Sequence, residues 1–308
     1  MKRFFLLLCA LTLWGAARGQ TVELSGAFGS QPFSVNLALQ DLVLLQNPEL
    51  SLEAAVSNQR AQVGARSALE FAAIGRATAY ARFAVAYTGG VRFEAGVKGA
   101  IGPVSLELSS AAWSAPINSF DPNAAFTWNP EPALGGGFYL GAQGAYRLSR
   151  TLVLNAGARY GTAQSRIYLR LENRAGDFSY GGGALLAWQS NGLTYGVTAF
   201  ARLSPQNQPY GLEGQVFAGV NEVVGFGFGG AGLSLDYTLE DLGTLNAFAI
   251  YEVWRLDVLP LRFGAGANLN LGPGVLFAQG FGGADLDWAF GWGVKLGYRL
   301  DLGALLNP

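Results

Sequence analysis

Histidine is absent from the 308-residue chain, and cysteine occurs once, at Cys9. Without histidine, neither a Ser-His or Cys-His nucleophile pair nor a histidine-ligated metal site can form. We therefore expect no enzyme, and we assign no catalytic, cofactor-binding or metal-binding residue and no cofactor. Paired carboxylates, which serve glycosidases, stay open in principle. The carboxylates on the polar face of the pattern described below, which we expect to pair with arginines, include Glu94, Glu107, Asp287 and Asp301.

Long apolar runs are also lacking. The run from residue 4 to residue 14 is too short to span a bilayer comfortably, and no later stretch reaches the ~18 apolar residues of a transmembrane helix. Two basic residues precede this run, and small residues follow it at Ala17 and Gly19. The pattern predicts a signal peptide over residues 1–19, with Gln20 as the mature N-terminus. Its removal takes Cys9 with it, so the exported protein has no disulfide.

Charge is sparse and nearly balanced. Charged residues make up 13% of the chain. Removing the three basic residues of the signal peptide from the 20 Lys and Arg leaves 17 against 21 Asp and Glu, a net charge near −4. No basic patch indicates a nucleic-acid partner, and we expect none.

What the chain does have is alternation. From Leu286 to Leu300 every second residue is bulky and apolar, whereas the residues between them, from Asp287 to Asp301, are small or charged. A period of two predicts a β-strand whose two faces lie in different media.

Two environments suit such a strand. The bulky face could pack on the core of a soluble sheet, or it could face lipid while the polar face lines a barrel. Trp288 and Tyr298 lie ten residues apart on the bulky face. This is roughly 33 Å along a strand, or about 25 Å along the membrane normal at ~40° tilt, which matches the apolar band of a membrane barrel. We therefore favour lipid, with Trp288 and Tyr298 as candidate members of aromatic girdles.

The pattern recurs through the chain, as in "GLTYGVTAFARL" and "LRFGAGANLNL". Turn residues separate the segments at 102–103, 190–192 and 272–274, which predicts antiparallel hairpins. About 18 segments are strand-like, and some are short. We expect an all-β fold over residues 20–308: a single antiparallel transmembrane β-barrel of about 16 strands, with a range of 14–18.

An alanine-rich region from residue 52 to residue 83 could instead be helical, because alanine is the best helix former. Alternation survives there at Arg76, Thr78 and Tyr80. We therefore expect strands.

The signal peptide, the alternating segments, the short turns and the aromatic edges resemble those of bacterial outer-membrane β-barrel proteins of the porin-like kind. The resemblance is architectural and matches no specific member. It implies export to the bacterial outer membrane and contact with outer-membrane lipid. It is also compatible with a homo-oligomer. The chain differs from these barrels in continuing as "RLDLGALLNP" after Tyr298, where such barrels commonly end on an aromatic residue.

The function we expect is passive diffusion of ions and small hydrophilic solutes through the barrel. One alternative is a non-conducting anchor whose lumen is filled by paired side chains, and another is a secreted soluble β-protein such as an adhesin. The residues that we expect to line the pore are Arg82, Arg92, Glu94, Lys98, Glu107, Arg159, Arg202, Arg262, Asp287, Lys295 and Arg299.

One connection, residues 113–133, is long and rich in proline. Its charged residues are Asp121 and Glu131, and counting strands places it on the outer side. It could fold inward as an acidic constriction loop opposite the basic wall, or pack over the rim through its aromatic residues.

Overall fold

The computed structural model describes most of the chain after residue 19. The described residues are 20–30, 33–46, 49–71, 75–114, 136–162, 165–189, 192–206, 208–222, 225–251, 260–285 and 288–303. The expected signal peptide, residues 1–19, lies outside them.

Within these residues the chain forms eighteen strands and one 3-10 helix. They are β1 (Thr21–Gly29), β2 (Ser34–Gln46), β3 (Glu49–Ser57), β4 (Arg60–Phe71), β5 (Gly75–Ala86), β6 (Val91–Ile101), β7 (Val104–Trp113), β8 (Gly137–Arg147), β9 (Leu152–Gly161), β10 (Ser165–Ala175), β11 (Phe178–Gln189), β12 (Gly192–Leu203), β13 (Tyr210–Asn221), β14 (Phe226–Leu239), η2 (Glu240–Leu242), β15 (Gly243–Tyr251), β16 (Leu261–Leu271), β17 (Gly274–Ala284) and β18 (Phe290–Asp301).

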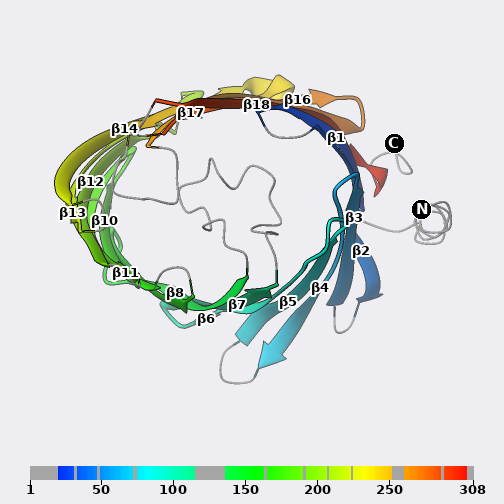
Figure 1. The fold of residues 1–308 in the computed structure, drawn as a ribbon, viewed down its shortest axis with the longest axis horizontal. Coiled ribbons are helices and arrows are strands. Elements are labelled where there is room, and N and C mark those ends of the chain that lie inside the picture. Colours follow the sequence, from blue (N-terminus) through cyan, green and yellow to red (C-terminus); the bar gives the residue numbers. More distant parts are fainter. Residues whose placement is uncertain are drawn as a thin grey trace.

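The strands form one closed barrel (Figure 1). Each strand pairs antiparallel with the next along the chain, and β18 pairs back to β1, so the sheet has no open edge. Closure satisfies the backbone groups that an edge strand would leave bare in lipid. The all-β barrel that alternation predicts is thus confirmed, and its eighteen strands stand at the upper end of the expected range. No helix in the described part of the chain is long and apolar enough to cross a membrane.

Local sequence explains several elements. The alanine-rich region forms β3, β4 and β5, because pairing within the barrel overrides helix propensity. Two-residue turns follow β6, β10 and β16, and each opens on a glycine with positive φ: Gly102 (57°), Gly176 (62°) and Gly272 (58°). Such a φ at the first turn residue suits a tight hairpin of the II′ kind. The turns expected at 102–103 and 272–274 are therefore confirmed, whereas residues 190–191 lie outside the described residues.

The barrel has two distinct ends. We call the end where β1 begins and β18 finishes the proximal end, and the opposite end the distal end. Connections at the proximal end are short, whereas the distal end carries the two longest ones, 114–136 and 252–260. The expected long loop does follow the seventh strand, on the end away from the described termini of the barrel.

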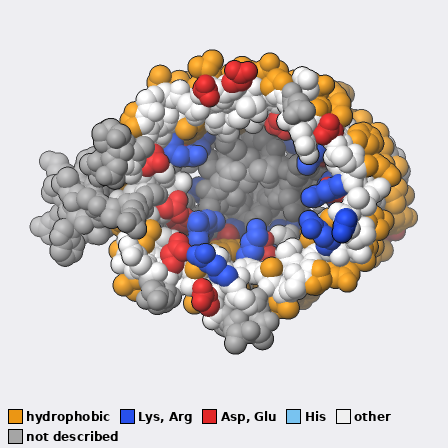
Figure 2. All heavy atoms as spheres, turned by 180° about the vertical axis from the view of Figure 1, so that it is seen from behind, with side chains coloured by type: hydrophobic (Ala, Val, Ile, Leu, Met, Phe, Trp, Pro, Cys, Tyr) orange, Lys and Arg blue, Asp and Glu red, His pale blue; other side chains and the backbone are white. Residues whose placement is uncertain are grey.

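The two faces of the wall differ completely in chemistry. Figure 2 shows apolar side chains around the outside of the ring and charged ones along its inner rim. The charged residues of the described strands, outside the irregular β2, all lie in one register, which faces inward. Glu23 and Arg299 belong to this register. The outward register carries exposed apolar residues such as Leu169, Val197 and Leu233, which are 51%, 59% and 54% exposed. A face with this much bare apolar surface would aggregate in water and is suited to lipid.

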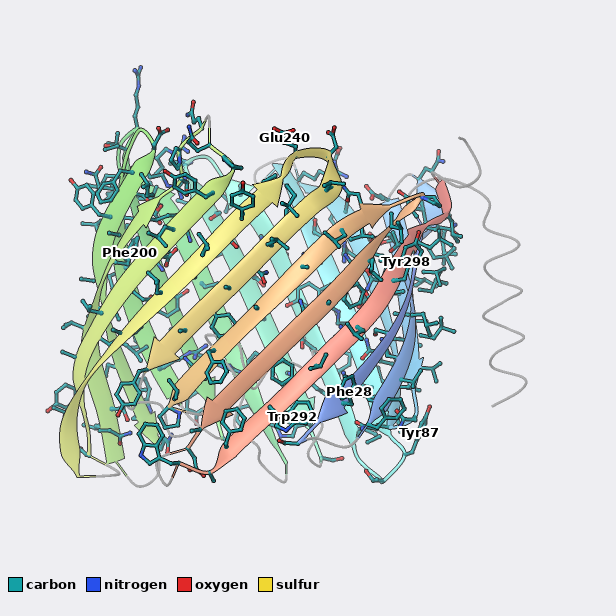
Figure 3. The ribbon with its side chains drawn as sticks, turned by 90° about the horizontal axis from the view of Figure 1, so that it is seen from above. Phe28, Tyr87, Phe200, Glu240, Trp292 and Tyr298 are labelled. Carbon is teal, nitrogen blue, oxygen red and sulfur yellow. The ribbon has the colours of Figure 1, made fainter. Side chains whose placement is uncertain are left out.

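Aromatic residues on the outward face gather near both ends, as Phe28, Tyr87 and Trp292 at one end and Tyr298 at the other illustrate in Figure 3. The exposed aromatic residues near the proximal end are Tyr146, Phe178, Tyr180, Tyr210 and Tyr237, and those near the distal end include Phe28, Tyr87, Phe138, Tyr160, Tyr195, Tyr251, Phe290 and Trp292. Two such rings are the arrangement that aromatic side chains adopt at the two interfaces of a membrane.

The candidate girdle residue Trp288 does not lie in a strand. The alternation predicts that the last strand starts near residue 286, but β18 begins at Phe290. Trp288 belongs to the turn before it, with a φ of 61° and a side chain that is 69% exposed. The reason is local: Asp285 Oδ1 accepts a hydrogen bond from the Ala289 amide at 2.8 Å, and the Asp285 carbonyl accepts one from the Trp288 amide at 3.1 Å.

Candidate functional site

The inner wall of the barrel is the candidate site, because the charged residues of its strands converge there. Of the residues expected to line a pore, the structure places ten on the inward register, whereas Asp287 and the loop residues Asp121 and Glu131 lie outside the described residues. The ten are Arg82, Arg92, Glu94, Lys98, Glu107, Arg159, Arg202, Arg262, Lys295 and Arg299.

Many charged residues on the inward register were not predicted, because the prediction used only the segments with the clearest alternation. Their positions follow from the same alternation, so the signal was present in the sequence. The additional inward residues are Glu23, Glu49, Glu53, Arg60, Arg66, Glu70, Arg76, Arg147, Arg166, Arg170, Glu172, Arg174, Glu213 and Asp236. Asp301 also faces inward, as its place on the polar face predicts.

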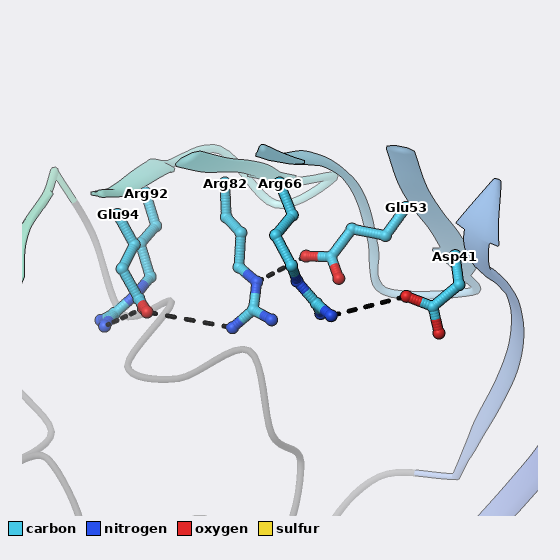
Figure 4. A network of polar contacts seen from close by, with 6 residues as sticks. All are labelled: Asp41, Glu53, Arg66, Arg82, Arg92 and Glu94. Atoms are coloured by element: carbon cyan, nitrogen blue, oxygen red, sulfur yellow. Dashed lines mark hydrogen bonds and ion pairs between the residues drawn. The ribbon is translucent and has the colours of Figure 1, made fainter. Parts of the chain in front are cut away.

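An ion-pair network covers the wall from β2 to β6 (Figure 4). At its centre Arg82 Nε donates to Glu53 Oε1 at 2.5 Å, and Arg82 Nη1 lies 3.9 Å from Glu94 Oε1. Arg92 Nη2 reaches the other oxygen of Glu94 at 3.4 Å. Arg82 and Glu53 stand on strands that are not neighbours, and Gly64 of β4 lies between them in register with both. Because glycine has no side chain, the two charged groups meet across the intervening strand.

The network continues to a distortion in β2. Arg66 Nη1 lies 3.5 Å from Asp41 Oδ1. Asp41 has a φ of 56°, a rare conformation for a residue other than glycine, and the pairing of β2 with β3 shifts register beside it. Such a bulge re-aims a side chain, and here it accompanies the contact of Asp41 with Arg66.

Nine ion pairs between described side chains run along the wall. They join residues on one strand, on adjacent strands or on strands two apart. Beyond the network they are Arg76–Glu49, Arg174–Glu172, Arg202–Glu213, Lys295–Glu23 and Arg299–Glu23. A lumen closed by its own charges would instead need pairs between opposite walls.

Aromatic side chains on the inward face share one arrangement. Each described inward aromatic side chain stands directly opposite a glycine on a neighbouring strand. The pairs are Tyr80–Gly96, Trp113–Gly137, Tyr139–Gly161, Tyr168–Gly157, Phe200–Gly181, Phe217–Gly230, Phe248–Gly264, Phe277–Gly297 and Phe281–Gly293. A Cβ built on Gly96 would lie 2.6 Å from the Tyr80 ring, and one on Gly264 would lie 2.7 Å from the Phe248 ring. In these two pairs the ring therefore fills the space over the glycine.

Arginine or lysine side chains lie against several of these rings. Arg159 Cζ lies 3.6 Å from the centroid of the Tyr139 ring, and Arg170 Cζ lies 3.7 Å from that of Phe200. The Lys295 ammonium lies 5.1 Å from the Phe277 centroid. These distances are within the range of cation–π attraction.

The inward side chains differ in exposure. Near the distal end Arg92, Arg262 and Asn221 are the largest fully buried side chains among the described residues. Near the proximal end inward residues such as Arg174 and Asn270 are exposed. Burial is not confined to the distal end, because Glu23 and Phe277, near the proximal end, are 5% and 4% exposed.

No family model matches the chain, and no curated protein matches its sequence. Solved structures do match, among them three from Pseudomonas aeruginosa. OpdO has 10% identity and a TM-score of 0.58, with 91% of this chain and 96% of that chain covered. OccK10 (OpdN) has 10% identity and a TM-score of 0.55, with 92% and 98% covered. OpdK, solved with vanillate, has 11% identity and a TM-score of 0.54, with 91% and 97% covered.

The chain has the fold of porin-like outer-membrane barrels. Nearly the whole of each chain takes part in the match, so the similarity concerns the complete porin-like barrel and not one hairpin. At about 10% identity it is the architecture that is shared. The chemistry of the inner wall of this porin-like barrel therefore follows from its own residues.

Proposed function

We propose that the protein is a passive diffusion channel of the outer membrane for ions and small hydrophilic solutes, and not an enzyme. The observation that carries the proposal is the direction of these nine ion pairs, each of which joins residues on one strand or on strands at most two apart along the wall. Barrels of 16–18 strands are wide enough to leave an aqueous channel. Inward charges hold water in that channel, and the apolar outer face holds the barrel in lipid.

The orientation follows from the connections. Outer-membrane barrels carry short turns on the periplasmic side and longer loops outside. We assign the proximal end, which has the short turns, to the periplasm, and the distal end, with connections 114–136 and 252–260, to the cell surface.

Solute entry into liposomes tests this function without relying on charge. The purified mature protein would be reconstituted, and swelling would be followed in neutral sugars of increasing size. We expect fast swelling with small sugars and a cut-off as size grows, because the charged wall sets a fixed cross-section. Liposomes that contain inserted protein but do not swell in the smallest sugar would favour the non-conducting anchor.

We also propose that the acidic connection between β7 and β8 contributes to ion selection. In planar-bilayer recordings with a salt gradient, Asp121→Asn combined with Glu131→Gln should shift the reversal potential toward anion preference. The reason is that basic side chains of the wall would then act without an opposing acidic loop. If the connection instead packs over the rim, the reversal potential will not move.

A further inference from the structure

Phe200 and Arg170 touch although they do not stand on neighbouring strands. Arg170 belongs to β10 and Phe200 to β12, with β11 between them. The Arg170 Cζ nevertheless lies 3.7 Å from the Phe200 ring centroid, so the guanidinium is stacked on the ring. Phe200, labelled in Figure 3, is only 7% exposed even though its register faces inward.

Two glycines of β11 make this contact geometrically possible. Gly181 is paired with Phe200, and Gly183 is paired with Arg170. A Cβ on Gly181 would lie 2.9 Å from Phe200 Cε1, and one on Gly183 would lie 3.3 Å from Arg170 Cα. The Phe200 ring therefore lies over Gly181, and Gly183 places no side chain beside Arg170, so neither position of β11 puts a side chain between the two groups.

The stacked arrangement decides where the Arg170 charge sits. Its Nε is buried and has no hydrogen-bond partner in the structure, so the ring face is the contact that holds this part of the side chain. An arginine without such a platform would extend into the lumen to reach water, because a guanidinium is expensive to leave buried and unpaired. Arg159 Cζ also lies over a ring, 3.6 Å from the Tyr139 centroid, but these two residues stand on adjacent strands, β9 and β8.

We propose that Phe200 is a positioning residue that holds Arg170 flat against the wall. The cation then contributes its charge to the lumen without occupying the lumen's cross-section. This inference rests on the proposed channel function for its consequence in conduction. The stacking itself can be tested without conduction.

The first experiment measures how fast phenylglyoxal, a guanidinium reagent, modifies Arg170 in the intact barrel, with mass spectrometry as the readout. Phe200→Leu keeps the apolar volume but removes the π face. We expect modification of Arg170 to become about fivefold faster, which corresponds to ~1 kcal/mol at ~1.4 kcal/mol per tenfold. Arg174, whose side chain is 57% exposed, is the internal reference and should react equally in both proteins.

Variants at the same position separate stacking from general loosening. Phe200→Tyr keeps a ring and should restore the slow reaction, whereas Phe200→Met, which is apolar and flexible, should behave like Phe200→Leu. Met also provides the result if the Leu variant fails to fold. Equal rates at Arg170 in wild type, Leu and Met variants would overturn the proposal, and so would a parallel rise at Arg174.

The second experiment measures single-channel conductance in a double-mutant cycle. Phe200→Leu should lower conductance because the released guanidinium enters the lumen. In the Arg170→Gln background the same change should have no further effect. A reduction that persists in that background would overturn the proposal. A wild-type protein that inserts without conducting would contradict the channel function alone, because the reaction with phenylglyoxal would still decide the role of Phe200.

Discussion

At the scale of single residues, the inward glycines do not by themselves show where the lumen has free volume. From the sequence, small residues on the polar face are expected to leave free volume. In the structure Phe281 covers Gly293, and Phe277 covers Gly297. A large side chain at Gly293 would therefore displace a ring before it reached the lumen. The width of the lumen depends on which residue stands opposite each glycine, and not on the glycine itself.

Adjacent residues on one strand test the two-faced wall. Leu233 of β14 faces outward and is 54% exposed, whereas its neighbour Ser234 faces inward, directly opposite Glu213. Leu233→Arg should lower the free energy of unfolding by about 2–4 kcal/mol, because it places a charge near the middle of the lipid-facing wall. Ser234→Arg should cost much less, since Glu213 and water can solvate the new guanidinium. The measurement is urea unfolding in lipid vesicles, followed by tryptophan fluorescence. Equal losses for both variants would contradict a lipid-facing exterior.

At the scale of strands, glycine lets charged and aromatic groups meet across an intervening strand. Gly64 allows Glu53 to reach Arg82, and Gly183 lies under Arg170 where it stacks on Phe200. Contacts of this kind tie three strands together with one pair of side chains. They stiffen the wall without filling the lumen.

Gly64→Ala tests this role against a matched alanine. A Cβ at Gly64 would lie 2.5 Å from Glu53 Oε1 and would displace the carboxylate from Arg82. At Gly214, which faces outward, a Cβ would have open space. Gly214→Ala should be neutral or slightly stabilising, because alanine loses less backbone entropy than glycine. We expect Gly64→Ala to be about 1 kcal/mol less stable than Gly214→Ala in the same unfolding assay. If the two variants are equally stable, the contact between Glu53 and Arg82 contributes nothing measurable.

Much of this strand organisation can be predicted from sequence because each strand carries its own period-two signal. The segments "GLTYGVTAFARL" and "LRFGAGANLNL" coincide with β12 and β16 from first to last residue. Three features could not be predicted, since they depend on partners far apart in sequence or on backbone geometry. These are the bulges of β2, the turn that removes Trp288 from β18, and the pairing of each inward ring with a glycine.

At the scale of the whole molecule, closure ties together a chain whose single cysteine cannot form an internal disulfide. β1 pairs with β18 through nine register positions from Thr21 to Gly29, and this pairing joins the first and last strands of the barrel. Signal-peptide removal after Gly19 would leave this seam complete, because β1 begins at Thr21. All lipid-facing backbone groups can then find partners within the sheet.

The purified protein should behave as an exported membrane barrel. We expect it in the outer-membrane fraction, soluble only with detergent, and with a gel mobility that changes on boiling because closure resists the detergent. Its intact mass should correspond to a chain that begins at Gln20. A protein that stays monomeric and soluble without detergent would contradict the lipid-facing exterior and favour a secreted soluble protein.

The most direct test of the central claim, an open lumen lined by charges, is single-channel recording in planar bilayers with purified wild-type protein. The ion pairs that run along the wall predict discrete conductance steps on each insertion, with current that rises in proportion to salt concentration. Protein that demonstrably inserts, as judged by protection from added protease, but never passes current would contradict the open lumen and leave the barrel as a structural anchor.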